Sequence, residues 1–440
     1  MRKHILIVLG LLVLLGIGGL VYLGWPDTAQ VDIARVQGAR PEITAPRKQL
    51  IPTVQVADAV GWGDAIPTPA PGLAVVAFAK GFSHPRWLYE LPNGDVLVAE
   101  SNSPPRKGGG LTGWVMKTLM GKAGAGVPSA NRITLLRDTD GDGVADARSV
   151  FASGLNSPHG MTLVGDTFYV ANTDALVRFK YRTGATKLTG EPETVVRYPG
   201  GGNHWARNVV ASADGKKLYV SVGSASNVAE GGLEKERRRA MIIEVDPATK
   251  AMRVFGAGLR NANGMAWEPR SGRLWTVVNE RDMLGSDIAP DYLTSVTLGD
   301  NFGWPWFYWG GYEDARVEPK NDELRQYSRR PDYALGPHVA ALGLTFAQNA
   351  RLGANFADGA FIGLHGSWNR KPVSGYKVVF VPFGQRGFPE PGVKPVDVLT
   401  DFLDKDGNAR GRPVGVIVDQ TGALLVADDV GNVVWRVAAK

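Results

Sequence analysis

The stretch VVASADGKKLYVSVG, residues 209–223, consists of an apolar strand, a turn with Asp-Gly, and a second apolar strand. Short β-rich runs joined by such a turn form β-hairpins. Similar units occur at 87–100 (WLYELPNGDVLVAE), 161–172 (MTLVGDTFYVAN), 265–280 (MAWEPRSGRLWTVVNE), 344–366 (LTFAQNARLGANFADGAFIGLHG) and 416–429 (VIVDQTGALLVADD). Six units in series predict an all-β domain, a six-bladed β-propeller. A β-sandwich is the alternative, but it does not explain why the unit recurs to the end of the chain.

Composition supports this fold class and narrows the function. The chain has 440 residues, 44% of them hydrophobic, which is enough for a large core. A net charge of +6 without a lysine–arginine block interleaved with aromatics argues against nucleic acid as a partner. There is no cysteine, which excludes disulfides, thiolate catalysis, iron–sulfur clusters and covalently attached c-type haem.

The N-terminus differs from the rest. Met1-Arg2-Lys3-His4 precedes an uncharged apolar run at 5–25, long enough to span a bilayer. We expect an uncleaved membrane anchor, with a cleaved signal peptide as the alternative, and in either case a periplasmic domain. The expected organisation is an anchor or signal at 1–25, a tether and surface segment at 26–71, and the propeller at 72–440.

A propeller brings the loops before the first strand and after the second strand of every blade to one central mouth. Five of the six histidines fall in such loops. They are His84, His159, His204, His338 and His365, and the same loops carry Arg86, Arg260, Arg370, Arg410 and Arg412. Arginine binds carboxylates bidentately, and histidine is a base near neutral pH. The mouth is therefore predicted to hold a polyanionic ligand beside a proton acceptor.

Six motifs in these loops carry a family resemblance. They are NSPHGM (156–161), GGGNHW (200–205), GLRNANGMAW (258–267), GDNFGWPWFYWGGY (299–312), HGSWNR (365–370) and GRPVGV (411–416). In this order they resemble the soluble, pyrroloquinoline-quinone (PQQ)-dependent sugar dehydrogenases, the glucose/sorbosone dehydrogenase family, over about residues 72–437. The likeness is greatest to the L-sorbosone dehydrogenase branch.

The resemblance implies a catalytic base and a set of cofactor ligands. It identifies His204 as the base. For PQQ it implies the Arg260-Asn261 pair and Arg410 with Arg412, and the family's cofactor lysine is matched by Arg370 or by Lys371 beside it. His338, at the same rim, is a further candidate PQQ ligand. The activity implied is oxidation of a sugar or a sugar-derived aldehyde or alcohol, with hydride transfer to PQQ.

The resemblance also implies a Ca²⁺ ion that activates the quinone. The family's calcium segment reads Gln-Gly-Pro, whereas this chain has Glu280-Arg281-Asp282, so Glu280 and Arg281 are the candidate ligands, through side chain or backbone. Asn203 replaces the acid beside the catalytic histidine. Because the chain has no cysteine for a haem, we expect a separate electron acceptor, a membrane quinone or a cytochrome.

Two further segments carry predictions. DTDGDGVAD places Asp138, Asp140, Asp142 and Asp146 as in the first half of a calcium loop, although Ser149 stands where such a loop has glutamate. A structural Ca²⁺ and an unoccupied acidic turn are both open. The insertion at 103–132 contains a predicted short helix at 114–122, either in a flexible surface loop or in a lid or docking site.

Two other function classes compete with the dehydrogenase. A calcium-dependent lactonase-type hydrolase also uses a propeller with a central metal, but such sites are rich in carboxylates rather than arginines. A non-catalytic propeller that serves as a binding platform is the second, because a fold does not fix a function.

Overall fold

The computed structural model describes residues 10, 11, 13–16, 18, 24, 27–47, 52–105 and 110–440. Among these residues no helix is long and apolar enough to cross a membrane. Most of the apolar run at 5–25 lies outside the described residues, so the anchor stays a prediction.

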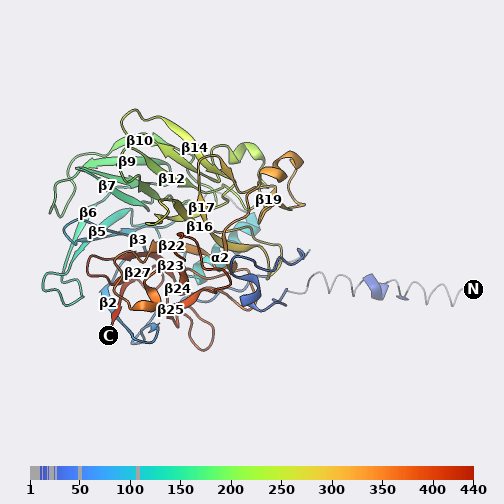
Figure 1. The fold of residues 1–440 in the computed structure, drawn as a ribbon. Helices are drawn as coiled ribbons and strands as arrows, with labels where there is room; N and C mark the ends of the chain where they lie inside the picture. Colours follow the sequence, from blue (N-terminus) through green and yellow to red (C-terminus); the bar gives the residue numbers. More distant parts are fainter. Residues whose placement is uncertain are drawn as a thin grey trace, which may run out of the picture.

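The structure confirms the six-bladed β-propeller (Figure 1). The first three blades are β3 (Pro85–Glu90), β4 (Val96–Glu100), β5 (Arg132–Arg137) and β6 (Ala147–Ala152); β7 (Met161–Val164), β8 (Thr167–Ala171), β9 (Ala175–Lys180) and β10 (Glu193–Arg197); and β11 (Val209–Ala211), β12 (Leu218–Val222), β13 (Met241–Val245) and β14 (Met252–Ala257), extended by β18 (Asp300–Asn301). Neighbouring strands of each four-stranded blade pair antiparallel, as the repeated hairpin predicts.

The last three blades follow the same plan. They are β15 (Ala262–Trp267), β16 (Leu274–Val278), β17 (Pro290–Val296) and β21 (Tyr333–Pro337); β22 (Ala341–Phe346), β23 (Gly359–Leu364), β24 (Lys377–Pro382) and β25 (Val396–Thr400), extended by β1 (Thr68–Pro69); and β26 (Pro413–Val418), β27 (Leu424–Asp428), β28 (Val433–Ala439) and β2 (Leu73–Lys80). The sixth blade joins both ends of the domain, because β2 pairs with β28 from Leu73↔Ala439 to Lys80↔Val433. This pairing closes the ring, and the blades keep only short outer edges.

Glycines set how closely the innermost strands approach the axis. A Cβ on Gly160, just before β7, would lie 2.5 Å from the backbone nitrogen of Val209 in β11. In β15 a Cβ on Gly264 would lie 2.6 Å from the carbonyl oxygen of Leu342, and in β26 one on Gly415 would lie 2.8 Å from that of Arg86. Only glycine permits inner strands of neighbouring blades to come this near.

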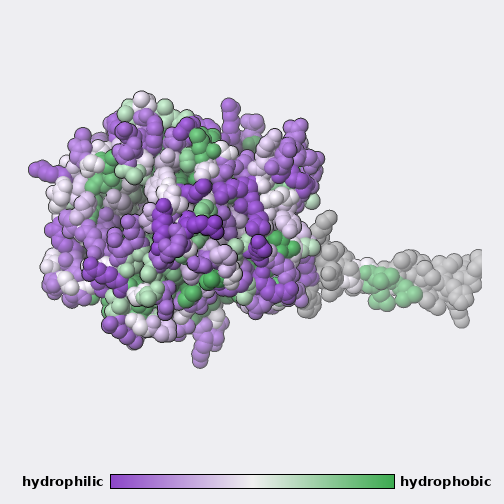
Figure 2. Space-filling model, viewed as in Figure 1, coloured by the Kyte–Doolittle hydropathy of each residue, from purple (hydrophilic) through white to green (hydrophobic). Residues whose placement is uncertain are grey.

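The core lies between the blades. Trp275 of β16 is fully buried and meets Phe383, next to β24, edge to face at 5.0 Å. Such contacts bury aromatic area and add pairwise attraction. The face seen in Figure 2 is mostly hydrophilic, with apolar residues in small separate groups. The hydrophobic residues of this chain therefore stabilise the contacts between neighbouring blades.

The connections carry short helices. They are η1 (Ile33–Val36), α2 (Gly110–Lys122), η2 (Leu233–Glu236), η3 (Asp322–Tyr327) and η4 (Ala354–Phe356), and a two-stranded ribbon of β19 (Phe307–Tyr308) and β20 (Tyr312–Glu313) lies between the fourth blade's third and fourth strands. The helix predicted at 114–122 is present and begins four residues earlier, as α2. Its C-terminal carbonyl, on Lys122, accepts a hydrogen bond from the backbone of Ala59 at 2.8 Å.

Residues 27–47 pack against the propeller. Val36 is fully buried, and Gly38 forms an antiparallel β-bridge with Ala334 of β21. The buried carboxylate of Asp27 accepts the backbone N–H of Ser286 at 2.5 Å and pairs with Arg47 at 2.5 Å. This part of the predicted tether is thus fixed to the loop at 284–287, which borders the mouth.

Replacing Asp27 by alanine is therefore expected to lower the free energy of unfolding by about 1–3 kcal/mol, because the buried N–H of Ser286 loses its acceptor. Urea unfolding of the purified protein measures the change. Asp64→Ala, at an exposed carboxylate, is the matched control and should stay within about 0.5 kcal/mol of wild type. Equal stability of Asp27→Ala and wild type would show that the segment only rests on the surface.

Candidate functional site in the propeller mouth

His204 lies in the glycine-rich loop before β11, and its ring is oriented by Ser224. Its Nδ1 lies 3.0 Å from the carbonyl oxygen of Ser224 and 2.9 Å from the hydroxyl. That hydroxyl donates its own hydrogen to the carbonyl of Ser226 at 2.7 Å, so it can only accept from the ring. Both partners of Nδ1 are acceptors, and Nδ1 therefore carries the hydrogen. In the neutral imidazole the basic lone pair is then on Nε2.

Arg207, which the sequence analysis did not single out, holds this loop in place. Its side chain is fully buried, and its guanidinium donates to the carbonyls of His204 at 2.7 Å, Ala206 at 3.1 Å and Pro199 at 3.0 Å. Burial lowers the pKa of Arg207 to about 10, which leaves it charged at neutral pH. Three charge-assisted hydrogen bonds from one planar group fix the backbone that presents His204.

The pair Arg260-Asn261 stands beside His204. A Cβ on Gly223 would lie 2.6 Å from Cβ of His204 and 2.7 Å from Oδ1 of Asn261, so the two side chains meet across this glycine. The amide of Asn261 donates to Oδ1 of Asn279 at 3.0 Å, while its own Oδ1 is buried without a hydrogen-bond partner. The structure thus brings the predicted base and the predicted asparagine together.

Arg260 is the centre of a buried network. Its guanidinium pairs with the carboxylate of Asp282 at 2.8 Å and donates to the carbonyl of Glu280 at 2.7 Å. Asn369 donates to the other oxygen of Asp282 at 2.8 Å. His338 is buried nearby, with Nε2 donating to the carbonyl of Gly285 at 3.0 Å and Nδ1 3.8 Å from Asp282. Burial lowers the pKa of His338, so its ring is neutral near pH 7.

A second cluster surrounds the buried carboxylate of Asp429. It receives Nε2 of His365 at 2.9 Å, Nε2 of His84 at 3.3 Å, and the guanidinium of Arg86. Arg412 lies against the same cluster and donates to the carbonyl of His365 at 3.0 Å. Burial lowers the pKa of His84 to about 4 and that of His365 to about 3, so both rings are neutral near pH 7.

Arg412 adds a second cation to this cluster, and the neighbouring buried carboxylate of Asp428 accepts its backbone N–H at 2.8 Å rather than its guanidinium. Arg86 is paired with Asp429, but within the described residues Arg412 has no ion-pair partner, and its hydrogen bonds run to carbonyl oxygens and a tyrosine hydroxyl. His159, fully buried between Trp87 and Trp205, has no hydrogen-bond partner at either ring nitrogen in the part of the chain that the structure describes. An uncompensated cation and unfilled buried hydrogen-bonding groups suit a compact polyanion, and a tricarboxylate such as PQQ fits these residues.

Two predicted cofactor ligands lie apart from this cluster. Arg370 is buried and donates to the carbonyls of Ser286 at 3.0 Å and Pro372 at 2.7 Å. Arg410 is half-buried, and its guanidinium reaches the carbonyl of Asp401 at 3.4 Å. The structure places neither beside Asp429, and their roles stay predictions.

The segment predicted to hold calcium is part of an internal ion network. The guanidinium of Arg281 is fully buried, pairs with Glu280 at 2.9 Å and Asp314 at 3.3 Å, and cannot ligate a cation. The carboxylates of Glu280 and Asp282 and the backbone oxygens could contribute there, but the Asp282 carboxylate accepts Arg260 and Asn369. The carbonyls of Glu280 and Asp282 also accept arginine donors. Within the described residues this segment thus presents few uncommitted oxygen ligands, and the mouth calcium stays a prediction.

Elsewhere, the carboxylates of Asp138, Asp140 and Asp146 lie close enough together to share a metal ion. Among the described residues, these three carboxylates form the one group of acids and histidines close enough to hold a metal ion. Asp142 is not part of this group. It sits in the turn between β5 and β6, away from the mouth loops.

The site thus consists of a histidine with a fixed tautomer and several buried arginines at the mouth of a six-bladed propeller. The chain belongs to the TrAA12-like family, whose model matches residues 67–291 and 291–440. It is 25% identical over 427 residues to a PQQ-dependent pyranose dehydrogenase of Coprinopsis cinerea, covering 83% of this chain and 54% of the relative. This match supports the predicted resemblance to PQQ-dependent sugar dehydrogenases. The greater likeness to the L-sorbosone dehydrogenase branch stays a prediction.

A second sequence relative and a solved structure are also similar to this chain. An uncharacterised protein of Borreliella burgdorferi is 30% identical over 241 residues, which cover 53% of this chain and 60% of that protein. The chain thus spans little more than half the length of these two relatives. The calcium structure of the family AA12 enzyme of Trichoderma reesei superposes with a TM-score of 0.69 at 20% identity, over 88% of this chain and 99% of that one.

The geometry around His204 predicts its tautomer. In selectively ¹⁵N-histidine-labelled protein near neutral pH, Nδ1 of His204 should show the shift of a protonated nitrogen and Nε2 that of a bare one. His204→Gln assigns the signals by removing them. The opposite tautomer would contradict the hydrogen bonds to Ser224 and remove the lone pair from the nitrogen proposed to act.

Proposed function

We propose that this protein is a quinoprotein dehydrogenase that oxidises a sugar, or an aldehyde or alcohol derived from one, with PQQ as cofactor. The observation that carries the proposal is the fixed tautomer of His204, which puts the basic lone pair on Nε2 of a side chain that lies next to Asn261 across Gly223. The PQQ dependence named for the Coprinopsis relative supports the choice of cofactor.

His204 would take the hydroxyl proton of the substrate on Nε2. The positive charge that the ring then acquires is stabilised by the carbonyl of Ser224, which accepts from Nδ1–H at 3.0 Å. Arg207 keeps the ring in position through the backbone and needs no movement during the reaction. General-base catalysis of this kind contributes roughly 10²–10⁴-fold to the rate.

Arg412, Arg86 and His159 would hold the cofactor, with Arg260, Asn261 and His338 at the neighbouring side of the mouth. We propose smaller contributions from Arg370 and Arg410, which lie apart from these groups. When bound, PQQ supplies the two-electron acceptor that takes the hydride from the substrate carbon.

We further propose that a Ca²⁺ ion, if bound with the quinone, would be held by oxygen ligands near Glu280 and would supply Lewis-acid polarisation there. A calcium structure exists for the Trichoderma enzyme, which supports a test for Ca²⁺ in this chain. The ligands here would differ from the family's, because Glu280-Arg281-Asp282 replaces its Gln-Gly-Pro segment. The substrate would be a sorbosone-like or aldose-like compound. A membrane quinone or a cytochrome would accept the electrons, with the enzyme held at the periplasmic side of the membrane by residues 5–25.

The competing functions find less support. A calcium-dependent hydrolase needs clustered carboxylates at the mouth, and the described acids that could share a metal lie instead at Asp138, Asp140 and Asp146. A passive binding platform would not require a histidine held in one tautomer by a buried serine and a buried arginine.

His204→Gln should leave PQQ binding nearly intact and lower turnover roughly 10²–10⁴-fold, because it removes the base but keeps a side chain of similar size. Dye reduction after reconstitution with PQQ and Ca²⁺ measures this across a panel of aldoses, sorbosone and simple alcohols. His84→Gln, assayed at saturating PQQ, is the comparison, and an equal loss in both variants would remove the special role of His204. A wild-type protein inactive on the whole panel would refute the proposed function.

Arg412→Ala should raise the PQQ concentration needed for half-saturation about 10- to 100-fold, since one charge-assisted contact contributes roughly 1.5–3 kcal/mol. Arg410→Ala should have a smaller effect, because Arg410 is half-buried and bonded elsewhere. The exposed Arg386→Ala serves as control. Titration by absorbance gives the values, and an unchanged titration in Arg412→Ala would rule out this arginine as a ligand.

A further inference from the structure

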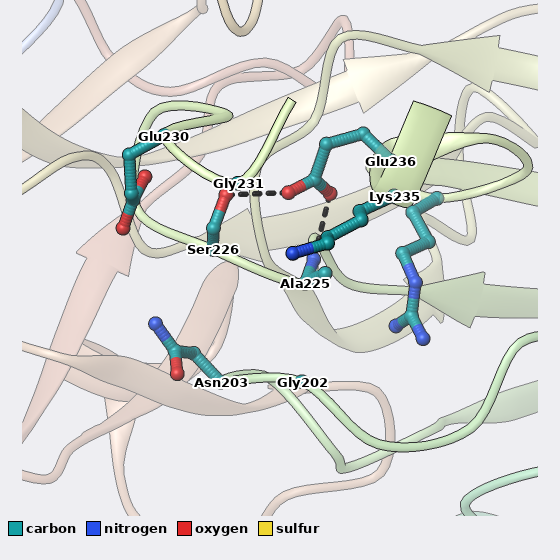
Figure 3. A pocket seen from close by; sticks show the side chains of 9 residues that line it. Gly202, Asn203, Ala225, Ser226, Glu230, Gly231, Lys235 and Glu236 are labelled. Carbon is teal, nitrogen blue, oxygen red and sulfur yellow. Dashed lines mark hydrogen bonds between the residues drawn. The ribbon is translucent and has the colours of Figure 1, made fainter. Parts of the chain in front are cut away.

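A pocket of about 490 Å³ opens directly beside the loop that carries His204 (Figure 3). Asn203, the neighbour of His204, lines one side, and Ser226 lines the other. The two sides are joined at the base, where the backbone N–H of Asn203 donates to the carbonyl of Ala225 at 2.7 Å. Ser224, which orients His204, is adjacent to this wall. The pocket therefore begins at the residue next to His204, although His204 itself does not line it.

Two buried charged residues build the walls. The carboxylate of Glu236, in η2, accepts the backbone N–H of Ala225 at 2.7 Å and the hydroxyl of Ser226 at 2.5 Å. The guanidinium of Arg239 donates to the carbonyls of Gly200 and Gly201, in the loop before His204. Because Glu236 and Arg239 already make their hydrogen bonds within the protein, they shape the pocket. Other lining side chains must therefore bind the ligand.

Lys235 offers the recognition group. It lines the pocket, and its ammonium has no hydrogen bond or ion pair within the described part of the chain. Figure 3 shows its side chain extending between Asn203 and the wall formed by Ser226 and Glu236. Glu230, on the other side, receives the backbone N–H groups of Asn227 at 3.1 Å and Val228 at 2.7 Å.

The pocket's chemistry suits a neutral, hydroxyl-rich group. Its charged residues are two acids, Glu230 and Glu236, and two bases, Lys235 and Arg239, so the balance of charge does not select an anion. No aromatic side chain lines it, so recognition must come from hydrogen bonds rather than ring stacking. Its volume lies within the usual range for small-molecule sites, roughly 300–1,000 Å³.

We propose that this pocket is a subsite for the sugar unit next to the one that is oxidised, and that Lys235 determines specificity by donating to its hydroxyls. The preferred substrate is then an oligosaccharide rather than a monosaccharide. This inference rests on the proposed function, because it places the reacting unit at His204. It adds the class of substrate and a residue that selects it.

The test compares Lys235→Ala with wild type, both loaded with PQQ and Ca²⁺, on a monosaccharide and on its di- and trisaccharides. Wild type should show the higher kcat/KM on the oligosaccharides. Lys235→Ala should lower kcat/KM for these about tenfold, as expected for hydrogen bonds to a charged group, and leave the monosaccharide within about twofold. Lys216→Ala, at an exposed lysine in the turn before β12, is the matched control.

A preference for the monosaccharide in wild type, or an equal fall on all sugars in Lys235→Ala, would overturn the subsite. Saturation-transfer NMR with the trisaccharide provides a readout independent of turnover, and its signal should weaken in Lys235→Ala. If the trisaccharide binds wild type more strongly than Lys235→Ala but no sugar is oxidised, the proposed function is refuted and the subsite is supported. Absence of trisaccharide binding to wild type would refute the subsite itself.

Discussion

The close approach of the inner strands around the propeller axis is the constraint on which the rest of the structure depends. Gly160, Gly264 and Gly415 stand where a Cβ would meet the backbone of the next blade, at 2.5–2.8 Å. A methyl group there would push blades apart and open the ring that β2 and β28 close. Because the ring is narrow, loops from distant parts of the sequence share one small mouth, and each of these glycines follows within a few residues of a mouth side chain.

The mouth is organised by arginines that bind carbonyl oxygens. Arg207, Arg412 and Arg370 each donate to at least two main-chain carbonyls. Such bonds fix the loops without neutralising the charge of Arg207 or Arg412, whereas Arg370 also lies 3.8 Å from Asp287 and Arg260 pairs with Asp282 at 2.8 Å. A buried cation without a counter-charge is costly, and an anionic ligand relieves that cost. The same groups thus hold the loops rigid and favour binding of a polyanion.

The sequence predicts the blades and part of the mouth, because hairpin turns and alternating strands are local signals. It also predicts that His204 and Asn261 meet, since strand ends of a propeller converge. It does not distinguish Arg412 from Arg410, two residues apart, of which only the first reaches the Asp429 cluster. Arg281 is not separable from surface arginines in the sequence, because it binds the distant loop at Pro305 and Phe307. Arg207 binds carbonyls of its own loop, whose shape the sequence does not give. The one local sequence signal for the hydrogen bonds from Arg207 to the His204 loop is the spacing HWAR, with an arginine three residues after the histidine.

The central claim is that the mouth binds PQQ between the Asp429 cluster and His204. A crystal structure of the protein grown with PQQ and Ca²⁺ tests it most directly. The account predicts density for one quinone whose carboxylates contact Arg412, with Nε2 of His204 facing the same cavity. Density at another place on the protein, or an empty mouth at a saturating concentration of PQQ, would contradict it.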